Sequence, residues 1–274
     1  MKQLLLIFFA ILVFQSCERE EEILINLPYK KKLISEVFLG EGDSSFSATL
    51  SYTQPIFGKP VLAEPVYATK ANAQISTDGK TFQLDYDSFN FNYKGSYIPN
   101  IIKAGETYHF KASDESETTT GFVTIPQKPA FDFELQFDSS FADIYFYNAT
   151  IKCTLKSNFS VNTKFVALIV FNDSSRSLLT EVTSSKVPVL KPNESVTKKL
   201  FASKSSEFVY PVRIECLGIS CSDSYMLYSN ATSIFNFSNI FPISEPTITY
   251  SNMSNKIGVI AAYSLSTPKK FNIQ

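Results

Sequence analysis

The sequence lacks most of the residue types on which catalytic and metal sites are built. Its 274 residues include no tryptophan, and His109 is the only histidine. A histidine-rich metal site is excluded by this count, and a Ser-His or Cys-His catalytic pair could use only His109 as its base. His109 lies in an alternating stretch of the first half, whereas the cysteines after Cys17 all lie in the second half. We therefore expect no enzyme activity, no metal and no cofactor, and we expect His109 to be a partly exposed strand residue.

An excess of charge of either sign is also absent. Lys and Arg number 25 and Asp and Glu number 26, so the formal net charge is −1. Because proteins that bind nucleic acid carry a basic surface, we expect no nucleic-acid partner. The lack of tryptophan removes the large aromatic platform that sugar-binding sandwiches commonly use, although the 14 tyrosines could take its place.

The apolar run at the N-terminus, residues 4–14, is too short to cross a hydrocarbon core of ~30 Å as a helix. It predicts a signal peptide over residues 1–16. Ser16 directly before Cys17 favours lipoprotein processing, in which Cys17 is acylated by fatty acids such as palmitate and becomes the mature N-terminus. A plain secreted protein and an uncleaved anchor are the alternatives. Residues 17–26 then form an acidic tether.

Three cysteines remain after Cys17, namely Cys153, Cys216 and Cys221. An odd number leaves at least one of them without an intramolecular partner. A Cys216–Cys221 bridge would require the chain to bend at Gly218 until the two α-carbons lie within ~7 Å. We expect that no disulfide is essential and that these residues act as small buried hydrophobes.

Alternation of apolar and polar residues dominates the rest of the chain and predicts strands that are covered on one face. It is found in residues 46–52, 72–77, 81–93, 107–113 and 120–126. The second half is also rich in predicted strands, over residues 131–137, 143–157, 164–172 and 208–220. Residues 165–171 are apolar throughout, which predicts a place in the middle of a core. Asp78-Gly79 is typical of a two-residue hairpin turn. Short strands at this spacing favour a β-sandwich, and Pro126 and Pro129 cannot continue a central strand. We predict a mainly β chain with an immunoglobulin-like β-sandwich over residues 27–127 and a second β-rich domain over residues 128–274.

One segment of the second half departs from the alternating pattern. Ser222 can cap a helix, and aromatic or β-branched residues follow at helical spacing: Tyr225, Tyr228, Thr232 and Phe235. We predict one amphipathic helix over residues 223–235. Its aromatic face either packs on the core or serves as a groove for a partner.

The segment over residues 85–97 is the first place in which to look for a binding patch. It places tyrosines among asparagines and serines, and the candidate residues are Tyr86, Tyr93 and Tyr97. An ordinary aromatic strand and hairpin is the alternative interpretation.

Together these features resemble the outer-membrane lipoproteins of Bacteroidota grouped as domain-of-unknown-function family 4249. The likeness includes the Cys17 tether, the stretch "AGETYHF…TTTGFVTIPQKP" and above all the ending "FPISEPTITYSNMSNKIGVIAAYS". The family ending matches at Pro246, Ser251, Asn252, Gly258 and Tyr263, whereas Lys256 stands where a first glycine is usual and Ala261 where a small glycine often follows an aromatic residue. The resemblance implies an outer-membrane address and no assigned activity.

In this context the acidic run after Cys17 has two interpretations. Glu18, Glu20, Glu21 and Glu22 resemble the acidic export signal that directs such lipoproteins to the cell surface. A solvated tether is the alternative, and the protein would then face the periplasm.

The favoured function is therefore a non-enzymatic, lipid-anchored protein of the cell envelope that binds a protein partner, as an accessory of a TonB-dependent outer-membrane receptor. Sheet edges or loop tips would form its contact surface. The alternative is a surface binding module for an extracellular glycan or peptide.

Overall fold

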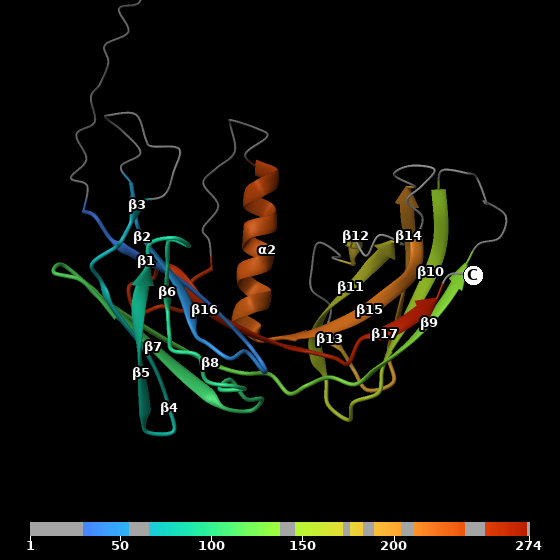
Figure 1. Ribbon diagram of the computed structural model, residues 1–274, viewed down its shortest axis with the longest axis horizontal. Helices are drawn as coiled ribbons and strands as arrows, with labels where there is room; N and C mark the ends of the chain where they lie inside the picture. The colour runs from blue at the N-terminus through green and yellow to red at the C-terminus, as the bar shows by residue number, and fades with distance from the viewer. Residues whose placement is uncertain are drawn as a thin grey trace, which may run out of the picture.

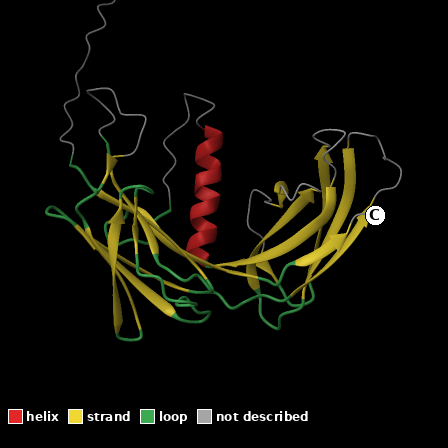
Figure 2. Ribbon diagram, viewed as in Figure 1, coloured by secondary structure: helices red, strands yellow, loops and turns green. Residues whose placement is uncertain are grey.

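The computed structural model describes residues 30–54, 66–137, 146–171, 176–182, 189–203, 211–238 and 250–272. Within them the chain is mainly β, as predicted, and α2 stands between two groups of strands (Figures 1 and 2). Each group encloses its own cluster of buried apolar side chains. No helix of these residues is long and apolar enough to cross a membrane.

The first group of strands curls around a core. Its strands pair in the order β16-β1-β2-β6-β5-β4-β7-β8, and β3 pairs with β2. They are β1 (Leu33–Gly40), β2 (Ser47–Tyr52), β3 (Val66–Tyr67), β4 (Asn72–Thr77), β5 (Lys80–Asp87), β6 (Asn92–Lys94), β7 (Thr107–Ser113), β8 (Thr118–Thr124) and β16 (Gly258–Leu265). Alternate residues of each strand point inward, as in β1, where Leu33, Val37 and Leu39 are fully buried.

The predicted hairpin at Asp78-Gly79 is confirmed. Thr77 pairs with Lys80, and both turn residues have positive φ, 45° at Asp78 and 72° at Gly79. Positive φ at both central positions is the conformation that matches the twist of the flanking strands.

The position of β16 corrects the predicted division of the chain. A domain over residues 128–274 would contain β16, but β16 runs parallel to β1, from the Ser35–Gly258 pair to the Gly40–Tyr263 pair. Its side chains from Val259 to Ala262 are all fully buried. A strand that is buried on both faces is apolar along its whole length. The sequence of β16 therefore does not indicate which strand it pairs with.

The second group of strands forms two facing sheets. One has the order β14-β10-β9, and the other contains β12, β11 and β15, with β13 paired to β11 and β17 paired to β15. Their bounds are β9 (Phe131–Phe137), β10 (Phe146–Leu155), β11 (Val161–Phe171), β12 (Arg176–Val182), β13 (Val189–Leu190), β14 (Ser195–Ser203), β15 (Pro211–Cys221) and β17 (Lys269–Asn272).

Aromatic rings join these two sheets across the second core. Phe131 of β9 contacts Phe165 of β11 edge to face, with 5.3 Å between the ring centroids, and Phe133 of β9 contacts the same ring edge to face at 6.3 Å. The rings of Phe131 and Phe133 lie 6.1 Å apart. Gly218 of β15 leaves room for Phe131, because a Cβ at this position would lie 2.3 Å from the ring. The apolar run of β11 belongs to this core, as predicted from its sequence.

The two groups are joined through β15 and β16. Residues 125–130 form no strand, in agreement with the predicted break at Pro126 and Pro129. Instead, residues 219–221 of β15 pair with residues 263–265 of β16, so that hydrogen bonds run without a break from one group to the other.

The helix α2 (Asp223–Ser238) begins directly after β15 and confirms the predicted helix. The Ser222 hydroxyl accepts a hydrogen bond from the Tyr225 backbone N–H at 3.2 Å, as expected of an N-cap. Tyr225 contacts Phe38 edge to face at 6.0 Å, and the Tyr228 hydroxyl donates to Glu36 at 2.7 Å. The described part of the aromatic face thus packs on β1. The side chains of Thr232 and Phe235 lie outside the described residues.

Candidate functional site

The three tyrosines of the predicted patch do not form one surface. Tyr93 is 2% exposed and belongs to the first core, so its assignment to a binding patch is wrong. Its hydroxyl donates to the Ala68 carbonyl and accepts from the Ala71 N–H at 2.9 Å. Burial raises the pKa of Tyr93 above its usual value. Tyr86 lies opposite Tyr93, with 5.4 Å between their rings, and also faces inward.

Tyr97 is exposed, but it follows β6, at the end of that strand opposite to the turn between β5 and β6. Its exposed fraction is 75%, and the adjacent Ile98 donates its backbone N–H to Ser44, in the connection between β1 and β2. Of the three candidates, only Tyr97 therefore presents its ring to solvent, and it does so away from the other two.

The turn between β5 and β6 carries exposed aromatic residues that the sequence reasoning missed. Phe89 is 87% exposed and Phe91 is 52% exposed. The Phe91 ring stacks on Tyr67 with 5.2 Å between centroids and an interplanar angle of 20°. A sequence signal was present, because Asp87-Ser88 starts a turn and so removes both phenylalanines from the alternating strand.

Asp87 fixes the shape of this turn. Its carboxylate accepts hydrogen bonds from the Asn90 side chain at 2.7 Å and from the Phe89 backbone N–H at 2.9 Å. These bonds favour the ionised form and lower the pKa of Asp87. The turn is therefore held by contacts within itself, with both phenylalanine side chains pointing outward.

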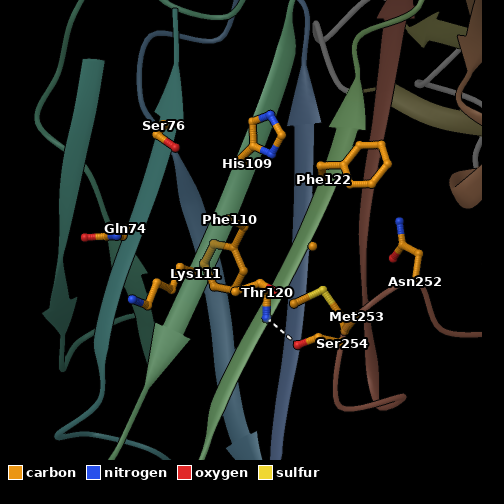
Figure 3. A pocket seen from close by; sticks show the side chains of 11 residues that line it. Gln74, Ser76, His109, Phe110, Lys111, Thr120, Phe122, Asn252, Met253 and Ser254 are labelled. Carbon is orange, nitrogen blue, oxygen red and sulfur yellow. Dashed lines mark hydrogen bonds between the residues drawn. The ribbon is translucent and has the colours of Figure 1, made fainter. Parts of the chain in front are cut away.

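A shallow groove of about 510 Å³ lies on the outer face of β4, β7 and β8 (Figure 3). Alternate residues of these strands form its floor, and the segment before β16 forms one side. The lining residues are Gln74, Ser76, His109, Phe110, Lys111, Thr120, Gly121, Phe122, Asn252, Met253 and Ser254. The groove is open to solvent along its length and contains no Asp or Glu.

Phe122 and His109 lie side by side on the floor of the groove. They are paired across β7 and β8, and their rings are 5.8 Å apart with an interplanar angle of 34°. Phe122 is 63% exposed, and the neighbouring Lys111 is also exposed. The groove thus offers one aromatic ring, one imidazole and one ammonium group within a few residues.

The side of the groove is held by hydrogen bonds from the C-terminal motif. Asn252 donates its side-chain amide to the Ile260 carbonyl at 2.8 Å and accepts from the Ile260 N–H at 2.9 Å. Ser254 donates its N–H to Thr120 at 2.7 Å and accepts from the Thr120 N–H at 2.8 Å. Gly121 permits this close approach, because a Cβ there would lie 2.6 Å from the Met253 sulfur.

The thiols of the described residues lie away from these surfaces. Cys153 and Cys216 are buried free thiols in the second core, and Cys221 is also buried, with its thiol 3.9 Å from the Ile219 carbonyl. Burial raises the pKa of Cys153 and raises the pKa of Cys216 to about 12, which disfavours the reactive thiolate. In the described ranges no group of three or more His, Cys, Asp or Glu is placed to hold a metal ion. Cys17, Glu18, Glu20, Glu21 and Glu22 lie outside these ranges.

The fold and the surfaces define a mainly β protein with two cores, an open groove and an exposed aromatic turn. The chain belongs to the family described as domain of unknown function (DUF4249), whose profile matches residues 20–268. Asn252 and Gly258 of the family ending are structural: Asn252 holds β16, and Gly258 has a φ of 98° and leaves room for the Ser35 carbonyl, which a Cβ would approach to 2.2 Å.

Solved structures with some similarity to the chain are distant. A mutant alpha-2-macroglobulin from Salmonella is 12% identical, with 71% of this chain and 14% of that chain covered and a TM-score of 0.24. A red sea bream transglutaminase is 8% identical, with coverages of 89% and 32% and a TM-score of 0.23. The chain therefore spans less than a third of the length of these proteins. A search of curated proteins finds no match to this chain.

Proposed function

We propose that this protein is a non-enzymatic, lipid-anchored binding protein of the cell envelope and an accessory of a TonB-dependent outer-membrane receptor. Acylated Cys17 holds it on the outer membrane, and the acidic residues from Glu18 to Glu22 direct it to the cell surface. The apolar run before Cys17 and the resemblance of the sequence to outer-membrane lipoproteins of Bacteroidota support this address. The groove on β4, β7 and β8 is its contact surface for the receptor.

The observation that carries this proposal is the exposed ring of Phe122 on the floor of an open groove. Aromatic side chains supply large contact areas at protein interfaces and are frequent among the residues that dominate binding energy. Phe122 stands on a strand paired along its length with β7, so its position is fixed before binding. An open, strand-built surface of this kind suits a macromolecular partner better than a reaction that must exclude water.

The acid–base inventory of the groove also favours binding over catalysis. General acid–base chemistry needs a titratable group positioned toward the reacting atoms, and the titratable groups in this groove are His109 and Lys111. The imidazole of His109 lies against the Phe122 ring. We therefore give His109 no catalytic role and assign the binding of the partner to the exposed Phe122 ring.

The test is a pull-down of the full chain from solubilised outer membranes. We expect a TonB-dependent receptor to copurify with the wild-type chain and with His109→Ala, and its recovery to fall several-fold with Phe122→Ser. Val189→Ser is the matched control, because Val189 is equally apolar and 54% exposed but lies beside the second core. Thermal melting of each variant checks that the fold is retained.

Equal recovery of the receptor with Phe122→Ser would remove the groove from the proposal. Loss of cellular function with His109→Ala, at unchanged receptor recovery and unchanged thermal melting, would reopen an enzymatic function. The second candidate is a binding module for an extracellular glycan or peptide. The Gln74 amide on the same groove floor as the Phe122 ring favours it, because sugars are bound by ring stacking together with polar side chains. Binding of a purified glycan that Phe122→Ser abolishes, with no receptor recovered, would support this candidate.

A further inference from the structure

The exposed turn between β5 and β6 forms, together with β3, a compact apolar projection. We define the aromatic tip as Tyr67, Phe89 and Phe91. Phe91 is held by stacking on Tyr67, and Phe89 is the most exposed of the large apolar side chains in the described residues, with 87% of its surface exposed. Exposed phenylalanines on a turn fixed by Asp87 are costly in water unless they contact an apolar medium.

The register of the strands places the aromatic tip at one end of the first group of strands, the predicted sandwich. This is the end where β1 begins. Leu33 pairs with Tyr52, and Tyr52 and Ser51 pair with Val66 and Tyr67. The chain that leads back to Cys17 leaves the sandwich at this same end. Tyr97, by contrast, lies at the opposite end of β6, next to the connection between β1 and β2.

We propose that the aromatic tip docks on the lipid bilayer to which Cys17 is attached, with the Phe89 ring in the interfacial region. The proposal rests on the lipid anchor of the proposed function and adds a second membrane contact to it. Aromatic residues favour the membrane–water interface, and stable membrane attachment commonly combines an acyl chain with a second contact. The anchor keeps the aromatic tip at high effective concentration beside the bilayer.

The tether alone does not determine the orientation of the sandwich. Residues 18–32 can span about 50 Å when extended, which allows either end of the sandwich to face the membrane. Contact through the aromatic tip would turn the start of β1 toward the bilayer.

Among the described residues at this end of the first group of strands, charges of the two signs nearly balance, and Asp87 of the β5–β6 turn adds one further carboxylate. Three lysines precede β1, and three carboxylates lie on the turn between β7 and β8, where Glu117 accepts the Leu33 N–H at 2.7 Å. These residues are Lys30, Lys31, Lys32, Asp114, Glu115 and Glu117. Docking should therefore depend on ring insertion and change little with salt or with anionic lipid, in contrast to a polybasic contact.

The absence of tryptophan allows a direct test. Phe89→Trp introduces a single fluorescent reporter at the aromatic tip, and Tyr97→Trp introduces the matched reporter at the opposite end. The full chain, acylated in a host that processes lipoproteins, is incorporated into phosphatidylcholine vesicles with or without phosphatidylglycerol, and lipids with brominated chains serve as quenchers. We expect Phe89→Trp to shift its emission to shorter wavelength and to be quenched, in both lipid mixtures, and Tyr97→Trp to do neither.

Absence of quenching of Phe89→Trp in chains that float with the vesicles overturns the proposal, and so does equal quenching of both reporters. Intact mass and flotation report the anchor separately, with Cys17→Ala as the chain that lacks it. If the wild-type chain proves not to be acylated, the lipid anchor fails, and quenching of Phe89→Trp at high vesicle concentration still decides whether the tip docks. Lack of quenching there overturns docking on its own account.

Discussion

At the residue scale, Lys256 has a backbone conformation that favours glycine. Its φ of 63° lies in the left-handed region, which costs an L-residue roughly 1–2 kcal/mol. Its side chain is exposed, so little packing depends on it. We expect Lys256→Gly to raise the free energy of unfolding by about 1 kcal/mol in denaturant melts.

The control for this prediction is Lys128→Gly. Lys128 is also exposed and lies outside the strands, but it is not among the described residues with positive φ. Glycine at this position gains no relief of strain and adds freedom to the unfolded chain, so stability should fall slightly. A Lys256→Gly variant that is destabilised as much as Lys128→Gly would show that the strain at residue 256 is negligible.

The side-chain direction of single residues could be predicted only where the alternating pattern was followed consistently. Tyr86 has the same parity as the buried Leu84, and Tyr93 lies directly opposite Tyr86, so both point inward. The patch prediction placed the tyrosines on the exposed face of an alternating strand, whereas Leu84 assigns Tyr86 to the inward face. The sequence therefore contained the direction of Tyr86, whereas that of Tyr93 also required the register of the hairpin.

At the scale of elements, Ser222 joins α2 to β16. Its hydroxyl accepts from the Tyr225 N–H at the start of the helix and from the Ala262 N–H at 3.0 Å. Ser222→Ala removes the acceptor for both donors, and we expect the free energy of unfolding to fall by about 1–2 kcal/mol in a denaturant melt. Ser222→Asp supplies a carboxylate acceptor in place of the hydroxyl and should restore most of the lost stability. Equal losses for both variants would contradict the capping role.

The existence of strands and of α2 followed from local patterns, because caps, turn residues and periodicity act over a few residues. Ser222 and Asp78-Gly79 are examples of such local signals. The pairing of β1 with β16 joins Ser35 to Gly258 and has no local signal. The groove could not be predicted for the same reason, since the contact of Ser254 with Thr120 depends on the position of β16 beside β1.

At the scale of the whole molecule, two separate cores predict two unfolding units. The first core draws on residues of β1, β2, β4–β8 and β16, and the second on β9–β11, β13–β15 and β17, with a short β15–β16 pairing between them. Phe133→Ala should lower the stability of the second unit by about 3–5 kcal/mol and leave the first nearly unchanged, because distant sites act independently. Calorimetry should then resolve two transitions, of which one moves.

Ile75→Ala is the matched variant in the first core, where Ile75 is fully buried. It should move the other transition, by about 2–5 kcal/mol. A single transition that both variants shift equally would show that β15, β16 and α2 couple the cores into one cooperative unit.

The hydrogen bonds between Ser254 and Thr120 have a further consequence for solubility. In the described residues β8 ends the order of paired strands in the first group, so its outer edge would otherwise present free N–H and carbonyl groups beside the exposed Phe122. Such an edge can pair with an edge of another molecule and start aggregation. Ser254 occupies the N–H and the carbonyl of Thr120 in the middle of that edge. The C-terminal segment thus keeps β8 from extending its sheet into a second molecule.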